Sequence, residues 1–192
     1  MIIIGITGTL GAGKGTVVEF LKREKGFNHF SVRDFLVEEI KKLGLPVNRD
    51  TMTAVANDLR AKHSPSWIVD RLYDKAKESG KNCVIESIRT PGEVYSLRKK
   101  GNFYLFAVDA DPGLRYQRIK ARGSETDHVD YATFLTNEKR EMDTDDPNKQ
   151  NLKKCIGLAD YVFENNSTID DLTRQVAAVV KEIQEKEPAA GS

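Results

Sequence analysis

The chain has 192 residues, enough for one domain with a sizeable core, and its formal net charge is +1. Acidic and basic residues are spread along it, so overall charge gives no argument for binding nucleic acid or an acidic membrane. Cys83 and Cys155 lack the spacing of a disulfide framework or a zinc site. With no targeting segment or membrane-spanning apolar run, we expect a monomeric cytoplasmic protein with two buried thiols.

A short apolar run followed by a glycine-rich loop opens the chain. Residues 2–6 are mostly isoleucine and uncharged, which predicts a strand buried on both faces of a parallel sheet. Glycines in the following loop allow positive φ and close approach of a ligand, and helical spacing begins near its end. Such a helix N-terminus attracts anions. The pattern predicts a phosphate-binding loop made by Gly8, Gly11, Ala12, Gly13, Lys14, Gly15 and Thr16.

Three residues of this loop have specific expected roles. Lys14 is expected to reach the β- and γ-phosphates of a nucleotide. The usual pattern places Ser or Thr directly after the lysine, but Gly15 stands there and Thr16 comes one residue later. We therefore expect Gly15 to contribute its amide, and Thr16 to lie near Mg²⁺ or the α-phosphate.

Strands and helices alternate along the rest of the chain. Further strands are predicted at 27–31, 82–86, 103–109 and 161–164. Helices are predicted at 34–43, 51–62 with Asp50 as N-cap, from Ser64 or Ser66 to 79, and at 91–100, 111–122 and 168–185. The polar stretch 123–150 is too long for a plain connection and is a candidate mobile lid. This order predicts an α/β fold of three layers, with a parallel sheet covered on both faces.

Two charged residues lie at the end of the predicted strand at 82–86 and just after it. Glu86 ends it, where an acid can orient Mg²⁺ or its water, and Arg89 is expected to project over the same crevice and contact phosphate. The alternatives are a helix-capping or surface glutamate and a solvated arginine.

A basic helix and one aspartate complete the candidate residues. Arg115, Arg118 and Arg122 are spaced three and four apart, which predicts one helix face beside the lid, where they could neutralise a transferring phosphoryl group. A solvated basic face is the alternative. Asp34 is either a first-turn residue that favours the helix dipole or a base that takes a proton from an acceptor hydroxyl, and both readings remain open.

These segments together resemble P-loop nucleoside monophosphate kinases. The segments are the loop with its Gly-Lys-Gly-Thr end, Ser-Val-Arg-Asp at 31–34, Glu-Ser-Ile-Arg-Thr at 86–90, the three-arginine helix, and Ala-Asp-Tyr-Val-Phe-Glu-Asn-Asn-Ser at 159–167. The chain is most similar to adenylate-kinase-related small nucleotide kinases, and its last segment also resembles dephospho-CoA kinase. The resemblance implies one P-loop NTPase domain with a five-stranded parallel sheet that transfers the γ-phosphoryl group of ATP with Mg²⁺. Its parts would be a core at 1–30, 80–122 and 155–185, acceptor-binding helices at 31–79, a lid at 123–150 and a flexible tail at 186–192.

The resemblance also implies roles for single residues. Arg89 corresponds to the arginine that grips the acceptor phosphate, Glu86 to the acid after the third strand, and Asn165 to the loop near adenine. Arg118 and Arg122 correspond to lid-side arginines, with Arg115 on the nucleotide side. Adenylate kinases usually have an arginine three residues after the Asp34 position, where this chain has Val37. The residues offered in its place are Arg33, Arg60 and Arg71.

Two other functions remain open from the sequence. One is phosphorylation of a hydroxyl, as in dephospho-CoA kinase, with Asp34 as the base. The other is a nucleotide-binding module without transfer. A GTPase is disfavoured because Asn-Lys-Gln-Asn at 148–151 lacks the aspartate of the guanine-binding motif, and no zinc deaminase signature is present. The acceptor is expected to be a small nucleotide-like molecule, and its identity is not given by the sequence.

Overall fold

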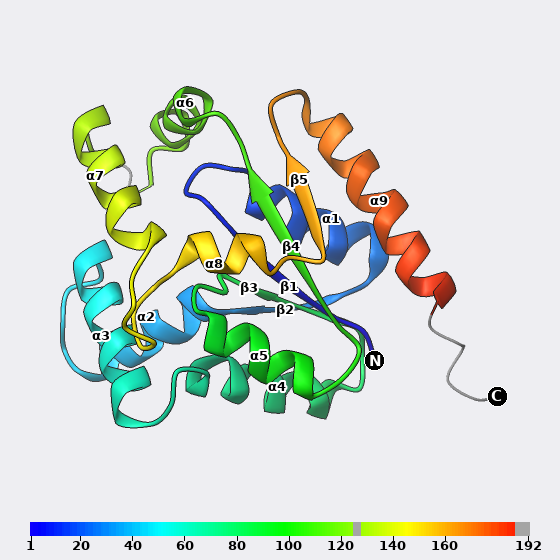
Figure 1. Ribbon diagram of the computed structural model, residues 1–192, viewed down its shortest axis with the longest axis horizontal. Helices are drawn as coiled ribbons and strands as arrows, with labels where there is room; N and C mark the ends of the chain where they lie inside the picture. The colour runs from blue at the N-terminus through cyan, green and yellow to red at the C-terminus, as the bar shows by residue number, and fades with distance from the viewer. Residues whose placement is uncertain (125–127, 187–192) are drawn as a thin grey trace.

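In the computed structural model, which describes residues 1–124 and 128–186, five parallel strands form one sheet (Figure 1). The strand order across the sheet is β2-β3-β1-β4-β5. This confirms the predicted three-layer fold with a five-stranded parallel sheet. The strands are β1 (Ile3–Gly8), β2 (Asn28–Ser31), β3 (Cys83–Glu86), β4 (Phe103–Asp109) and β5 (Tyr161–Glu164).

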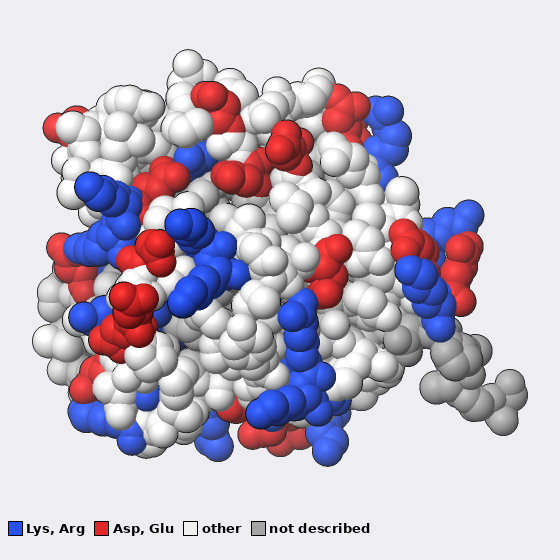
Figure 2. All heavy atoms as spheres, in the orientation of Figure 1, with Lys and Arg blue, Asp and Glu red and all other residues white. Residues whose placement is uncertain are grey.

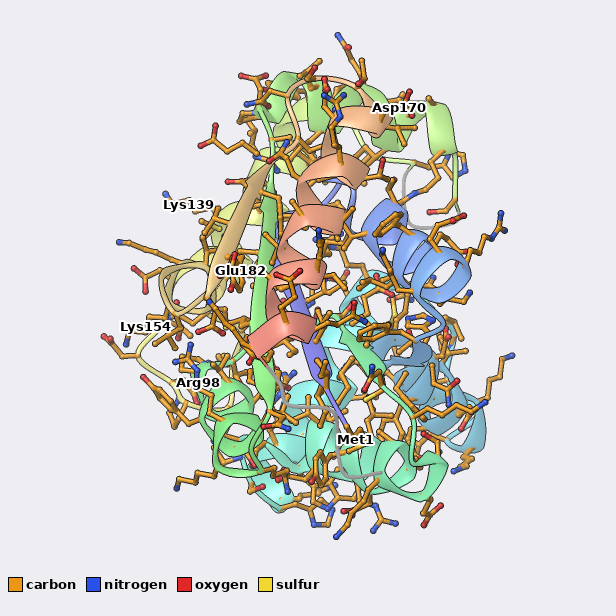
Figure 3. The ribbon with its side chains drawn as sticks, turned by 90° about the vertical axis from the view of Figure 1, so that its right-hand side faces the viewer. Met1, Arg98, Lys139, Lys154, Asp170 and Glu182 are labelled. Atoms are coloured by element: carbon orange, nitrogen blue, oxygen red, sulfur yellow. The ribbon has the colours of Figure 1, made fainter. Side chains whose placement is uncertain are left out.

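Helices cover both faces of the sheet. On one face α1 and α9 lie side by side (Figure 3), and their apolar residues share a core with β1 and β4. The other face is covered by α4, α5 and α8, with α2 and α3 beside them, around a second core. The helices are α1 (Lys14–Lys25), α2 (Val32–Lys42), α3 (Arg49–Lys62), α4 (Trp67–Ser79), α5 (Pro91–Lys99), α6 (Pro112–Arg122), α7 (Tyr131–Met142), α8 (Leu152–Gly157) and α9 (Ile169–Lys186).

Strand β1 lies in the middle of the sheet and is buried along its whole length, as its sequence predicts. Ile3 packs in one core, whereas Ile4 and Ile6 pack in the other. Gly5 leaves room for its neighbours, since a Cβ there would stand 2.5 Å from the Cδ1 of Ile88. Because β1, β3 and β4 are parallel, their carboxyl ends meet at one edge, where ligands of such sheets bind.

The starts of some helices differ from the prediction because more than one residue near each start could serve as the N-cap. Ser31 caps α2 by accepting a hydrogen bond from the Asp34 amide at 3.1 Å, so the helix begins at Val32. The expectation that Asp50 caps α3 is wrong: Asn48 is the N-cap and accepts from the Thr51 amide at 2.9 Å. Ser66 precedes α4, as one of the two alternatives expected, but its hydroxyl donates to Asp70.

The predicted lid stretch contains a helix that the sequence analysis did not foresee. Helix α7 is capped by Asp130 and buries Phe134, and it lies between α6 and α3 (Figure 1). Residues 125–127 of this stretch lie outside the described residues, and its mobility stays a prediction. The predicted tail at 186–192 also lies outside them, except for Lys186, the last residue of α9.

The state of the two cysteines and the distribution of surface charge are as the composition predicts. Cys83 and Cys155 are free and buried, as expected, and burial raises the pKa of Cys83 to about 11. Acidic and basic side chains are interspersed on the face drawn in Figure 2. Among the described residues, no helix combines the length and apolar character needed to cross a bilayer.

Candidate functional site

The loop between β1 and α1 has a backbone that requires glycine. Gly8 has φ 133° and Gly13 has φ 105°, both in the region that side chains rarely adopt. A Cβ at Gly8 would lie 2.0 Å from the carbonyl oxygen of Val108, and one at Gly13 would lie 2.3 Å from Nδ2 of Asn165. At Gly15 a Cβ would meet nothing within 4 Å. The first two glycines are therefore fixed by close contacts, and Gly15 is not.

Lys14 lies inside this loop. Its Nζ donates to the carbonyl oxygens of Gly8 at 2.9 Å and Thr9 at 2.7 Å. Burial, and after it the charge of Arg89, lowers the pKa of Lys14 from 10.5 to about 7, while Glu86 acts in the opposite direction. An anion beside Nζ would offset the loss of hydration that lowers this pKa. The loop is thus arranged so that a bound phosphate stabilises the protonated lysine.

Asp109, the last residue of β4, and Asn165, the first residue after β5, hold the loop in place. Asn165 donates from Nδ2 to the carbonyl oxygen of Ala12 at 2.8 Å, and its amide donates to the Asp109 carbonyl at 2.8 Å. The Thr9 hydroxyl donates to the Asp109 carboxylate at 2.5 Å. Asn165 therefore holds the loop backbone directly, which its expected position near adenine did not predict.

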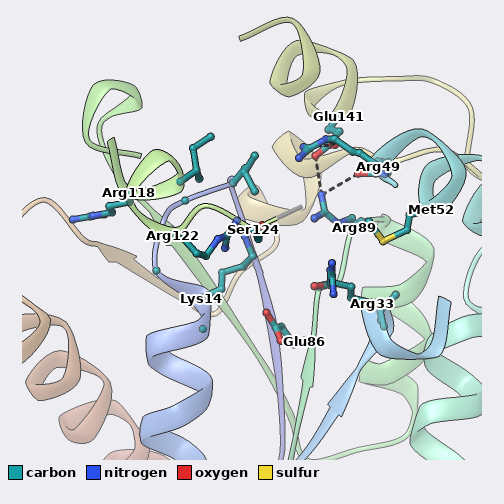
Figure 4. Close-up of a pocket in the computed structure, with 18 of the residues that line it drawn as sticks. Lys14, Arg33, Arg49, Met52, Glu86, Arg89, Arg118, Arg122, Ser124 and Glu141 are labelled. Atoms are coloured by element: carbon teal, nitrogen blue, oxygen red, sulfur yellow. Dashed lines mark hydrogen bonds and ion pairs between the residues drawn. The ribbon is translucent and has the colours of Figure 1, made fainter. Parts of the chain in front are cut away.

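A cavity of about 710 Å³ extends from the loop across the carboxyl ends of β1 and β3 to α2 and α3. We call its two ends the P-loop end (Gly13, Lys14, Thr16, Arg118 and Arg122) and the arginine end (Arg33, Arg49, Arg60, Arg89 and Glu141). Figure 4 shows Lys14 and Arg122 across the cavity from Arg49 and Arg89, with Glu86 between the two groups. Anionic groups at the two ends would therefore face one another.

Glu86 lies where the sequence places it, at the carboxyl end of β3, and it lines the cavity. His29 on the neighbouring strand β2 holds its carboxylate through Nε2 at 3.1 Å. Burial raises the pKa of Glu86, but the hydrogen bond and charge of His29 and the charges of Lys14 and Arg89 outweigh it, so the pKa lies below its ordinary value. The ionised form is thus favoured beside the P-loop.

Arg89 is held at both its backbone and its guanidinium group. Its amide donates to the Glu93 carboxylate at 2.7 Å. Its Nη1 donates to Glu141 at 2.8 Å and to Gln150 at 3.0 Å. The predicted lid stretch, which contains both of these acceptors, therefore contacts the arginine end.

Glu141 is a buried acid between two arginines (Figure 4). Its side chain is 5% exposed, and its Oε1 accepts from Arg49 Nη2 at 2.6 Å and Nε at 3.0 Å, while Oε2 accepts from Arg89. Burial raises its pKa, but the charges of Arg89 and Arg49 and their hydrogen bonds outweigh burial and leave the pKa below its ordinary value. Glu141 is therefore an ionised carboxylate inside the cavity.

Beneath these residues is a buried ion pair. Arg60 and Glu93 lie 2.8 Å apart with side chains 1% and 0% exposed. Glu93 also accepts from the amides of Arg89 and Thr90 as part of the capping box that begins α5. Arg60 lines the cavity, and its Nη1 has no hydrogen-bond partner among the described residues. The pair thus fixes the backbone from which Arg89 projects.

A family model described as an AAA domain matches residues 4–145. A UPF0200 protein of Methanococcus vannielii is 32% identical over 187 residues, covering 95% of this chain and 97% of the relative. The chain belongs to the AAA domain and UPF0200 families. A second UPF0200 relative, from Pyrococcus abyssi, is 28% identical and covers 94% of this chain and 96% of its own length.

Solved structures with the same architecture include several kinases. A shikimate kinase from Bacteroides thetaiotaomicron has a TM-score of 0.59 at 12% identity, covering 96% of this chain and 98% of its own. A dephospho-CoA kinase from Campylobacter jejuni has a TM-score of 0.51 at 15% identity, covering 94% and 96%. Protein TT1252 from Thermus thermophilus has a TM-score of 0.58 at 23% identity, covering 94% and 97%. These likenesses show that this UPF0200 member has the P-loop kinase-like fold.

The three arginines of α6 do not act as one group in this UPF0200 protein. Arg118 and Arg122 line the cavity as predicted, and Arg118 donates to the Asn165 carbonyl at 2.8 Å. Arg115 does not line it. This side chain is buried and donates to both oxygens of Glu138 on α7, at 2.8 and 2.9 Å. Arg115 therefore does not share the phosphate-contacting position expected for the three arginines. Helical spacing gives the direction of a side chain but not the partner that a neighbouring helix supplies.

Asp34 lies in the first turn of α2, is exposed and does not line the cavity. This position agrees with the structural alternative for Asp34 and gives no support to its role as a base. Among the three arginines offered in place of the one missing at Val37, Arg33 and Arg60 line the cavity and Arg71 does not.

Arg49 and Glu141 are site residues that the sequence analysis missed. Arg49 is the first residue of α3, and Glu141 lies near the end of α7. The sequence around each of them is typical of a charged residue on a solvent-exposed surface. The sequence contained one indication of these residues, the expected position of the lid at 123–150 over the acceptor-binding helices at 31–79. That position predicts contact between the two stretches but does not say which residues meet.

Proposed function

We propose that this protein is a phosphotransferase that moves the γ-phosphoryl group of ATP to a small phosphate-bearing acceptor, with nucleoside monophosphates as the first candidates. The observation that carries the proposal is the cavity with a phosphate-binding loop at one end and a set of arginines at the other. Two anionic substrates can meet in such a site because each end supplies cations for one of them.

The P-loop end suits the triphosphate of ATP. Its donors are the amides at the start of α1, which has no acidic residue in its first turn and no side chain capping it. Lys14 adds a charge that a phosphate would stabilise, and Arg118 and Arg122 extend the basic lining. Together these groups would neutralise charge on the transferring group.

A magnesium ion fits beside this end. The Thr16 hydroxyl and the Glu86 carboxylate line the same cavity, and both are oxygen ligands that Mg²⁺ prefers. In the described part of the chain no cluster of three or more His, Cys, Asp or Glu side chains could hold a metal by itself. Mg²⁺ ordinarily takes one or two carboxylates and completes its shell with substrate phosphates and water. When bound, it would neutralise charge on the β- and γ-phosphates.

The arginine end suits an acceptor that has both a phosphate and an apolar part. Arg33, Arg49 and Arg89 supply guanidinium groups, which match phosphate oxygens in pairs. Leu36, Met52 and Ala56 line the same end and offer apolar surface to a base or a similar ring. An acceptor that lacked phosphate would leave this charge uncompensated.

The reaction would then be an in-line transfer. An oxygen of the acceptor phosphate forms a bond to the γ-phosphorus while the bond from that phosphorus to the β–γ bridging oxygen breaks, and ADP leaves with the electron pair. Lys14, Arg118 and Arg122 would stabilise the charge on the transferring group. Closure of the stretch 123–150 would exclude water, which otherwise competes as the acceptor.

The test is ADP release from Mg-ATP with a panel of acceptors: AMP, CMP, UMP, GMP, their deoxy forms and dephospho-CoA. The proposal expects turnover with one or a few monophosphates. Turnover with dephospho-CoA alone would contradict transfer to a phosphate oxygen, because the accepting group would then be a hydroxyl, and it would require a base other than the exposed Asp34. ATP binding without acceptor-dependent ADP release from any member would favour a nucleotide-binding module and contradict catalysis.

A further inference from the structure

The arginine end already contains an anion of the protein's own. Arg49 donates twice to one oxygen of Glu141, and Arg89 donates once to the other. This carboxylate comes from α7, 92 residues after Arg49 and 52 after Arg89. Two guanidinium groups on one carboxylate form the arrangement that also recognises a phosphate.

The charges at this end do not balance. One carboxylate offsets only one of the two guanidinium groups, and Gln150, which also accepts from Arg89, is neutral. Arg33 adds a further positive charge at the same end, and Lys14 lies across the cavity. Glu86, between the two groups, supplies one more carboxylate, so positive charge still exceeds negative charge. Arg49 and Arg89 would therefore attract a doubly charged anion more strongly than they attract the Glu141 carboxylate. A singly charged carboxylate would be attracted only about as strongly as Glu141 itself.

We propose that Glu141 is a specificity-determining residue: its carboxylate occupies Arg49 and Arg89 until an acceptor with a dianionic phosphate displaces it. The inference rests on the proposed function and concerns the charge that the acceptor must have. Singly charged and neutral acceptors leave Glu141 in place and find the two arginines occupied. A phosphate dianion takes over the guanidinium donors and releases the carboxylate toward solvent.

Helix α7 has other contacts that remain when the Glu141 carboxylate leaves Arg49 and Arg89. Glu138, one turn earlier, pairs with Arg115, and Arg115 also donates to the Leu10 carbonyl of the loop at 3.4 Å. On its outer side Arg140 pairs with Asp50 of α3 at 3.1 Å. Replacement of the Glu141 charge is therefore expected to leave α7 in position, which makes a binding test practical.

The experiment is calorimetric titration of inorganic phosphate into protein saturated with a non-hydrolysable Mg-ATP analogue, so that the P-loop end is filled. In Glu141→Gln, which keeps the shape and removes the charge, we expect phosphate to bind about tenfold tighter or more, since no internal anion competes. Asp50→Asn, which loosens the outer contact of α7 without touching the cavity, is the matched control and should leave phosphate affinity unchanged.

Formate is the second probe, because it resembles the carboxylate that the substitution removes. We expect formate to compete with phosphate in Glu141→Gln and not in the wild type. If Glu141→Gln fails to fold, Glu141→Asp takes its place, with an intermediate gain in phosphate affinity because the shorter side chain holds the arginines less well. The melting temperature of each variant shows whether the fold is kept.

Equal or weaker phosphate binding by Glu141→Gln would overturn the inference and make Glu141 a residue that only holds the arginines in place. Absence of phosphate binding by both proteins would overturn it as well. Neither outcome depends on turnover, so the failure is distinguishable from that of the proposed function. A protein that releases ADP normally with a monophosphate but shows no effect of Glu141→Gln loses only the inference.

Discussion

We expect the two ends of the cavity to bind anions by different means. At the P-loop end, main-chain amides and Lys14 come from one continuous stretch, and glycines with positive φ let the chain fold closely around a ligand. At the arginine end, side chains from α3, the loop after β3 and α7 meet, and an internal carboxylate holds them together. Local backbone geometry thus sets one end, and long-range ion pairs set the other.

This difference predicts different responses to substitution. A change at the P-loop end should abolish the reaction while leaving the ion pairs intact. A change at the arginine end should affect stability or acceptor binding while leaving ATP binding intact.

The largest effect is expected for Lys14→Ala. Lys14 lines the P-loop end, and in the proposed reaction its charge stabilises the transferring group. We therefore expect turnover to fall about a thousandfold or more with the melting temperature little changed. Lys22→Ala, an exposed lysine of the same helix, is the control for ADP release. Wild-type turnover in Lys14→Ala would contradict the assignment of this end.

Glu93→Gln, beneath the arginine end, should be the most destabilising change. It removes the partner of Arg60, whose side chain is 1% exposed, and leaves a buried charge uncompensated. Loss of such a partner ordinarily costs about 3–5 kcal/mol, to be measured as the free energy of unfolding in urea. Glu19→Gln, in an exposed pair on α1, should leave the unfolding curve unchanged. Equal stability of the two variants would mean that the buried pair does not support Arg89.

Gly13→Ala tests the backbone of the loop. The added Cβ would lie 2.3 Å from Asn165 Nδ2 at a φ of 105°, so we expect a loss of about 1–3 kcal/mol in unfolding free energy and weaker ATP binding. Gly15→Ala is the matched control for stability, because a Cβ there meets nothing within 4 Å and the residue lies in a helix. A stable Gly13→Ala variant would show that the loop tolerates another conformation.

Arg49→Gln should weaken binding of the acceptor and leave binding of ATP unchanged. Loss of a charged hydrogen-bond donor to phosphate ordinarily costs about 1.5–3 kcal/mol, which corresponds to a rise of about tenfold or more in the acceptor KM. The KM for ATP should stay the same. Lys62→Gln, at the far end of the same helix, is the control. A change in the KM for ATP instead would break the separation between the two ends.

The smallest effect is a pH dependence of nucleotide affinity. Because the pKa of Lys14 is about 7 in the free protein, the lysine is protonated below that pH and increasingly neutral above it. Bound phosphates raise this pKa, so binding above about pH 7 takes up a proton and affinity falls as pH rises, by at most about tenfold per pH unit. Calorimetry of an ATP analogue in buffers of different ionisation enthalpy measures the proton uptake. No uptake at about pH 8 would contradict the lowered pKa.

The comparison also explains what the sequence could predict. The strands at 103–109 and 161–164 match the structure to the residue, and the P-loop end was identified almost completely, because both depend on patterns within a few neighbouring residues. Glu86 and Arg89 followed from the rule that ligands bind beyond the carboxyl ends of parallel strands. Information of this kind is local or topological.

The remaining site residues depend on pairs of distant segments. Nothing near Glu141 distinguishes it from its solvated neighbours, and its burial becomes evident only when α7 packs against α3. The prediction for Arg115 failed for the same reason, since its partner Glu138 comes from another helix. Helical spacing predicts the side on which a residue lies, but tertiary contacts decide whether it faces ligand, protein or water.

The most direct test of the central claim is transfer of label from ATP labelled at the γ-phosphate. The protein, Mg²⁺ and labelled ATP would be incubated with each acceptor, and the products separated. Our account predicts that the label appears in a nucleoside diphosphate made from a monophosphate acceptor, and that Lys14→Ala abolishes it. Label found only in inorganic phosphate, with every acceptor unlabelled, would contradict the claim that the arginine end receives the substrate.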